Sequence, residues 1–131
     1  MAGPVFHMAA GAPRPVAPFS HAVEADGWVL VTGQMPNEPG NEDAPLPPDI
    51  EGQTRAVMAN LKIVLASLGL GLEHVVMARV YLTHFREDYA RMNTVYATYW
   101  DEDRRPARTC IGVTALALDA RIEIDLVAKR P

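Results

Sequence analysis

An arginine and a cysteine two residues apart are the first candidates for chemistry in this chain. Arg108 and Cys110 stand in the segment RRPARTCIGV, residues 104–113, after a proline and at the start of an apolar run that predicts a buried strand. In one interpretation the arginine ends the strand, with its stem along the core and its guanidinium in water. In the other, its planar pair of donors binds an anionic ligand.

Two carboxylates in the last predicted strand are the second set of candidates. In RIEIDLVAK, Glu123 and Asp125 alternate with Ile122, Ile124 and Leu126, so both carboxylates share one face. The preceding strand also has a polar face, which carries the guanidinium, the thiol and a glycine that leaves room beside them. If the two polar faces coincide, they line one pocket. Otherwise the carboxylates are ordinary solvated strand residues, and the pattern alone leaves both possibilities open.

Composition limits the class of partner. The chain has 131 residues, 49% of them hydrophobic and 21% charged, which predicts one globular domain small enough to gain from oligomerisation. Twelve basic against sixteen acidic residues give a net charge of −4, so we expect a small-molecule partner, with no nucleic acid and no membrane surface. One cysteine and four scattered histidines predict no disulfide and no metal site.

The N-terminal segment is expected to lie outside the fold. Residues 1–15, MAGPVFHMAAGAPRP, lack a basic start and are interrupted by glycine and proline, so they do not resemble a targeting segment. We expect them to form a flexible extension before a single domain of residues 16–131. No run is apolar enough to span a membrane, and we expect the protein to be cytoplasmic.

The elements that must position the candidates begin with a hairpin. Residues 27–34, GWVLVTGQ, predict a strand that pairs with residues 20–24 across the turn ADG. The segment 35–49 is rich in proline, asparagine, aspartate and glycine and predicts an irregular surface loop. From Asp49 apolar residues recur every three or four positions, which predicts one long amphipathic helix that ends at Gly69.

The second half of the chain supplies a strand, a helix and two closing strands. Residues 75–83, VVMARVYLT, predict a strand with two largely apolar faces, one of which carries Val76. A helix over residues 86–100 has an aromatic stripe that we expect to pack as core: Phe85, Tyr89, Met92, Tyr96 and Tyr99. The order ββαβαββ predicts an α+β fold with two helices on one face of a sheet. The two-sided strand therefore needs further cover, for which we expect a second subunit.

Six stretches of the sequence resemble a known family. They are PFSHAV, VTGQMP, QTRAVMANLKIVL, MNTVYATYW, RPARTCIGV and RIEIDLVA, in the order and spacing of the RidA/YjgF family of enamine and imine deaminases, and the resemblance runs from about Pro18 to Arg130. It implies a chorismate-mutase-like fold and a homotrimer with a central β-barrel, whose active clefts lie between subunits. It also implies no metal and no organic cofactor.

The resemblance also assigns candidate roles to residues. It implies that Arg108 binds the carboxylate of a small substrate, that Cys110 lies beside it, and that Glu123 orients the attacking water, so these are the candidate catalytic residues. Further candidate substrate-binding residues match other positions that line the family's cleft: Phe19, Ser20, Thr32, Gly33 and Asn93.

This chain departs from the family pattern at several positions near the expected cleft. Many deaminases carry Tyr in place of Phe19, Ser in place of Thr32, Glu in place of Gly112, Arg in place of Ala115 and Pro in place of Ala117. These differences put the substrate in doubt. Three functions are therefore open: hydrolysis of 2-imino acids, non-catalytic binding of a small carboxylate, and ribonuclease activity, against which the acidic net charge argues.

Overall fold

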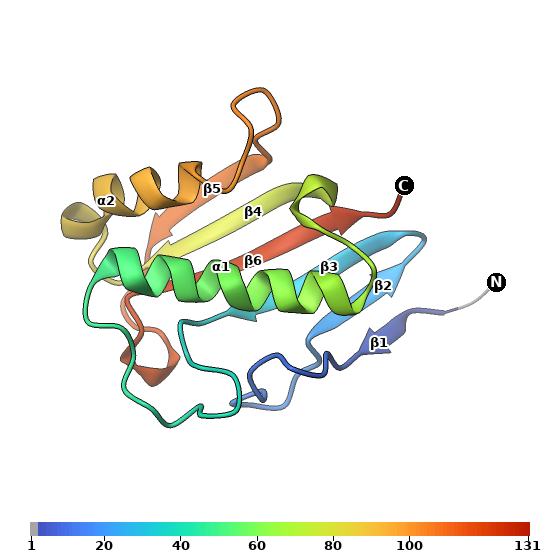
Figure 1. Cartoon of the computed structure of the whole chain (residues 1–131), viewed down its shortest axis with the longest axis horizontal. Helices are drawn as coiled ribbons and strands as arrows, with labels where there is room; N and C mark the ends of the chain where they lie inside the picture. Colours follow the sequence, from blue (N-terminus) through green and yellow to red (C-terminus); the bar gives the residue numbers. More distant parts are fainter. Residues whose placement is uncertain (1–2) are drawn as a thin grey trace.

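The computed structural model describes residues 3–131, and two helices pack on one face of a six-stranded sheet (Figure 1). The two helices are α1 (Ile50–Ser67) and α2 (Phe85–Ala97). The strands are β1 (Val5–His7), β2 (Ala22–Ala25), β3 (Trp28–Gln34), β4 (Val75–Leu82), β5 (Ala107–Gly112) and β6 (Ile122–Lys129). The predicted α+β class is confirmed, as is the order ββαβαββ from β2 onward.

The sheet has the strand order β1-β2-β3-β6-β4-β5, so the last strand lies in the middle. All neighbouring strands are antiparallel except β4 and β5, which are parallel. Because α2 joins these two parallel strands and α1 joins β3 to β4, both helices cross over the same face of the sheet (Figure 1). β5 is left at an edge, and its residues are exposed or half-buried rather than buried as its sequence suggested.

Residues 5–7 of the N-terminal segment form β1 of the sheet, where we expected a flexible extension. Val5 pairs with Glu24 across β1 and β2, and the small side chain of Ala9 is buried. The buried His21 holds this segment: its Nδ1 accepts the Ala9 N–H at 2.8 Å, and its Nε2 donates to the Pro13 carbonyl at 2.8 Å. The composition of the segment could not reveal this anchor, because the anchoring histidine lies outside the segment, just before β2.

The predicted hairpin and first helix are confirmed, with turn and cap residues that explain them. Asp26 and Gly27 both have positive φ, 53° and 79°, as the tight turn between β2 and β3 requires. The Asp49 carboxylate accepts the Gly52 N–H at 2.7 Å and caps the first turn of α1. Gly69, with φ of 73°, ends that helix.

The start of β4 differs from the predicted alternation. An irregularity in the pairing with β6 between Val75 and Met77 puts Val75 in the core and leaves Val76 42% exposed. Strict alternation predicted that Val76 shares a face with Ala78 and Val80, but these two residues are buried and Val76 is not. Beyond it the alternation holds, and Ala78 and Val80 lie fully buried under the helices.

The sheet face opposite the helices carries large apolar side chains that are about half exposed to solvent in the single chain. Leu30 is 53% exposed, Trp28 45% and Ile111 45%. The expectation that β4 needs cover on two sides therefore extends to the whole sheet. In the described part of the chain, neither helix is long and apolar enough to cross a membrane.

Candidate functional site

The guanidinium and the thiol of β5 point to the helix side of the sheet. In the parallel pairing of β4 with β5, Arg108 is level with Ala78 and Cys110 with Val80, two residues buried under the helices. Paired residues of neighbouring strands share a face. Arg108 and Cys110 therefore lie under α2 at the exposed edge of the sheet, and both are half-buried.

Three side chains of α2 surround the Arg108 guanidinium. Nη1 donates to the Asn93 Oδ1 at 2.7 Å, and Nη2 lies 3.5 Å from the Tyr89 hydroxyl. The guanidinium carbon lies 5.0 Å from the ring centroid of Tyr96 and 5.9 Å from that of Tyr89, distances at which a cation is attracted to a ring face. These contacts hold the planar group in place.

The charge of Arg108 is not balanced within the chain. Throughout residues 3–131 no carboxylate lies within 4.0 Å of it, whereas Arg14, Arg79, Arg121 and Arg130 each pair with one. A half-buried, oriented and unpaired guanidinium is suited to bind an external carboxylate or another anion.

The Cys110 thiol is a neutral neighbour of this cation. Burial raises the pKa of the thiol, and the positive charge of Arg108 offsets this only in part. Since the thiolate is the nucleophilic form, Cys110 is suited to contact a ligand rather than to attack it.

Tyr89 joins this cluster, although the sequence predicted only a core role for the aromatic stripe of α2. Tyr96 is buried as expected, but Tyr89 is 37% exposed and stacks on Phe85 with ring centroids 4.7 Å apart. The sequence spacing could have predicted this contact. Residues 89, 93 and 96 are four and three positions apart, so on a helix the predicted site residue Asn93 shares its face with both tyrosines.

The Glu123 carboxylate lies on the opposite face of the sheet. Glu123 is level with Tyr81 of β4, outside the buried row of Ile122 and Ile124. Its carboxylate lies directly against the Cα of Gly33, where any side chain would displace it. Burial raises the pKa of Glu123, and the negative charge of Asp125 raises it further. Such a carboxyl group is suited to accept and return a proton at a higher pH than an ordinary glutamate.

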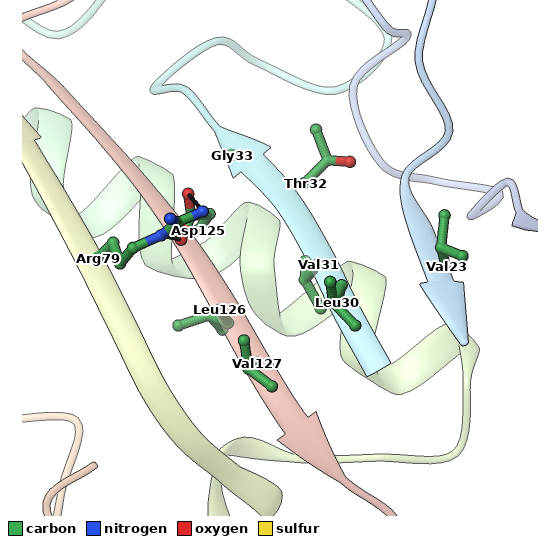
Figure 2. A pocket seen from close by; sticks show the side chains of 9 residues that line it. All are labelled: Val23, Leu30, Val31, Thr32, Gly33, Arg79, Asp125, Leu126 and Val127. Carbon is green, nitrogen blue, oxygen red and sulfur yellow. Dashed lines mark hydrogen bonds and ion pairs between the residues drawn. The ribbon is translucent and has the colours of Figure 1, made fainter. Parts of the chain in front are cut away.

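Asp125, on the same face as Glu123, forms an ion pair with Arg79. It accepts hydrogen bonds from Arg79 Nε at 2.8 Å and Nη2 at 3.0 Å, and from the Tyr81 hydroxyl at 3.0 Å. Figure 2 views this face and shows the Arg79 and Asp125 side chains meeting over β6, beside a cavity of about 240 Å³ that Thr32 and Gly33 also line. The ion pair fixes the carboxylate that perturbs Glu123.

The other predicted binding residues lie around the same end of β3. Phe19 and Gly33 line a common narrow cavity. The Thr32 hydroxyl donates to the Ser20 carbonyl at 2.6 Å, so this hydroxyl connects β3 to the segment before β2. Phe19, Ser20, Thr32, Gly33 and Glu123 therefore form one cluster, which we call the carboxylate cluster.

The polar faces of the two closing strands do not coincide within one chain, so of the two possibilities that the sequence left open, one chain does not form the shared pocket. β4 lies between β5 and β6, which the sequence did not reveal. Arg108, Cys110 and Asn93 form an arginine cluster on the helix side, whereas Glu123 points to the open face. One chain therefore carries the arginine cluster and the carboxylate cluster on opposite faces of its sheet.

Comparisons with known proteins agree with the fold. The family model described as endoribonuclease L-PSP matches residues 9–130. A RutC family protein of Pyrococcus horikoshii is 38% identical over 117 residues, which cover 89% of this chain and 90% of that protein.

Two solved structures are similar over nearly the whole chain. A Yersinia pestis protein of unknown function from the conserved Rid protein family, YyfA, is 29% identical with a TM-score of 0.90, covering 98% of this chain and 100% of its own. Escherichia coli TdcF with bound serine is 28% identical with a TM-score of 0.86, covering 95% and 99%. The chain therefore belongs to the RidA/YjgF family, whose sequence model is described as endoribonuclease L-PSP.

Proposed function

We propose that this protein hydrolyses small 2-imino acids, and enamines that tautomerise to them, to 2-oxo acids and ammonia. The observation that carries the proposal is the unpaired Arg108 guanidinium, which Asn93 and two tyrosine rings orient at the sheet edge. A substrate carboxylate would complete its hydrogen bonds. The similar TdcF structure holds serine, whose carboxylate is of the kind that we expect Arg108 to bind.

We propose further that the active site forms between subunits of a homotrimer. Within one chain the arginine cluster and the carboxylate cluster lie on opposite faces of the sheet, so a second copy must bring them together. The apolar open face gives the reason to associate, because Trp28, Leu30 and Ile111 are about half exposed. Three open faces that close around one axis would form the central barrel implied by the family resemblance.

The trimer is the first testable expectation. Sedimentation equilibrium at micromolar concentration should give three times the chain mass of 14.3 kDa. Replacing Leu30 on the open face by Glu should shift the protein towards monomer, because it places charges in a desolvated interface. A wild-type monomer that still turns over substrate would contradict the shared site.

The proposed reaction needs only positioning and proton transfer. In an enamine such as 2-aminoacrylate, protonation of the terminal carbon gives the 2-iminium acid. Water then attacks the iminium carbon while Glu123 accepts one of its protons, which forms a carbinolamine. Glu123 then returns this proton to the nitrogen and accepts the hydroxyl proton, so that ammonia leaves as the C–N bond breaks and the C=O bond forms. Because the iminium is electrophilic, a bound carboxylate and an oriented water suffice.

The contact between Gly33 and Glu123 provides a second test. A Cβ at position 33 would lie 2.8 Å from the Glu123 Cδ, closer than real contacts allow, and Glu123 is a flexible side chain that can move away. We expect Gly33→Ala to remain folded, with an unchanged melting temperature, while its kcat falls roughly tenfold or more because the carboxylate is displaced. Unchanged kcat would mean that the position of Glu123 does not matter.

The experiment that tests the proposed function is a coupled assay. An amino-acid oxidase generates 2-imino acids from amino acids, semicarbazide traps those that remain, and a deaminase lowers the yield of trapped product. The same protein is titrated with 2-oxo acids by calorimetry. Binding without turnover would replace the proposal by a non-catalytic carboxylate-binding role, and cleavage of RNA with no effect on imino acids would favour the ribonuclease alternative.

A further inference from the structure

We infer that the preferred substrate carries a second acidic group at the end of its side chain, and that Arg105 binds this group. The inference rests on the proposed function, in which Arg108 binds the carboxylate next to the imine carbon, and it names the class of 2-imino acid. It comes from a cavity of about 270 Å³ that both arginines line.

The charge of this cavity is unusual for a chain with a net charge of −4. The residues that line it include no acid: Asn93, Tyr96, Ala97, Arg105, Pro106 and Arg108. In the part of the chain that the structure describes, neither guanidinium lies within 4.0 Å of a carboxylate, although other arginines are paired. The cavity therefore carries two positive charges that the chain leaves without an anionic partner.

A neighbouring cavity shows that this excess is local. Arg104 lines a separate cavity of about 190 Å³ together with two acidic residues, Glu73 and Asp101. The adjacent residues Arg104 and Arg105 thus line two different cavities. Of these two cavities, only the one that Arg105 shares with Arg108 has no acidic residue in its lining. Arg104 is accordingly the matched control for Arg105, since both are exposed and belong to the same loop.

The spacing suits a short dicarboxylate. Arg105 and Arg108 are three positions apart in the chain, so their Cα atoms lie at most about 11 Å apart. Both side chains line the shared cavity. Asn93 occupies one donor group of Arg108 and leaves others free for a ligand. A 2-imino acid with four or five carbons and a terminal carboxylate would pair with both guanidiniums, whereas an uncharged side chain would leave Arg105 unpaired.

The test compares two ligands of equal length. The probes are 2-oxoglutarate and 2-oxopentanoate, which differ only in a terminal carboxylate or methyl group, titrated by calorimetry at matched ionic strength. We expect the wild-type protein to bind 2-oxoglutarate roughly fivefold or more tightly than 2-oxopentanoate. Arg105→Gln should remove this preference and leave 2-oxopentanoate binding unchanged, while Arg104→Gln should keep it. Equal affinities in the wild type, or a preference retained in Arg105→Gln, would overturn the inference.

Turnover separates this inference from the proposed function. The coupled assay is repeated with the imino acids derived from glutamate and from norvaline, its uncharged five-carbon counterpart. Hydrolysis of both with equal kcat/KM, and no binding preference, would defeat the inference but not the deaminase. A binding preference for 2-oxoglutarate without any turnover would defeat the deaminase and leave Arg105 as a carboxylate ligand. If Arg105→Gln lowers the melting temperature but does not change the binding preference, Arg105 has a structural role.

Discussion

Replacing Glu123 by glutamine is expected to lower kcat by roughly two to four orders of magnitude while leaving 2-oxo acid binding nearly intact. The amide keeps the shape of the carboxylate, and its oxygen can still accept a hydrogen bond from water. It cannot take the proton that the attacking water must lose. Single-turnover measurements with the norvaline-derived imino acid, alongside calorimetry with 2-oxopentanoate, separate these two effects.

The same substitution should change the pH dependence. Because burial and the neighbouring Asp125 raise the pKa of Glu123, the wild-type kcat should rise with pH as this carboxyl group ionises, with a midpoint above the ordinary value of 4.5. The glutamine variant has no group to ionise there and should lack that rise. Glu102→Gln, at an exposed position away from both clusters, serves as the control and should keep the wild-type profile.

Stability gives an independent check on the environment of Glu123. A pKa that is higher in the folded than in the unfolded state means that the ionised carboxylate destabilises the fold at higher pH. Glu123→Gln should therefore melt at a higher temperature than the wild type at pH 8, and the difference should vanish as the pH falls below the ordinary glutamate pKa.

An unchanged kcat in Glu123→Gln would contradict the proposed catalytic role of Glu123. Glu123 would then be a structural strand residue, and Asp125 would be the next candidate for the base.

The local elements of this fold could be predicted from the sequence because short-range signals determine them. The Asp26–Gly27 turn, the Asp49 cap and the apolar periodicity of α1 are each contained in a few neighbouring residues. The order of the strands is not, because it depends on long-range pairing. The parallel pairing of β5 with β4, and the central place of β6, therefore required the structure.

The same distinction applies to the candidate site. Strand alternation correctly put Glu123 with Asp125, and Arg108 with Cys110, on single faces. Alternation within a strand could not predict whether the polar face of β5 and the polar face of β6 lie on the same side of the sheet. In the structure they lie on opposite sides. The contact of Tyr89 with Arg108 and the role that we propose for Arg105 were not predicted, because an aromatic stripe is usually a core feature and a charged loop is usually solvated.

The second large effect on kcat/KM is expected from substitutions of Arg108. If Arg108 holds the substrate carboxylate through two parallel hydrogen bonds, Arg108→Lys keeps the charge but replaces an oriented fork by one mobile donor group. The loss of one charge-assisted hydrogen bond costs about 1.5–3 kcal/mol, so kcat/KM should fall roughly tenfold to more than a hundredfold. Arg104→Lys, in the neighbouring cavity, should leave kcat/KM unchanged.

Arg108→Ala should lose more activity than the lysine variant, because the carboxylate then enters the cleft with no cationic partner. The melting temperature should change little in either variant, since Arg108 packs on Tyr89 and Tyr96 at a sheet edge and forms no ion pair with a carboxylate within residues 3–131. Lysine also loses the contact with the Asn93 amide oxygen that orients the fork, so the effect should appear in KM for the substrate as well as in kcat. Wild-type kcat/KM in Arg108→Lys, or unfolding of Arg108→Ala, would return this residue to the structural role of a strand-end arginine.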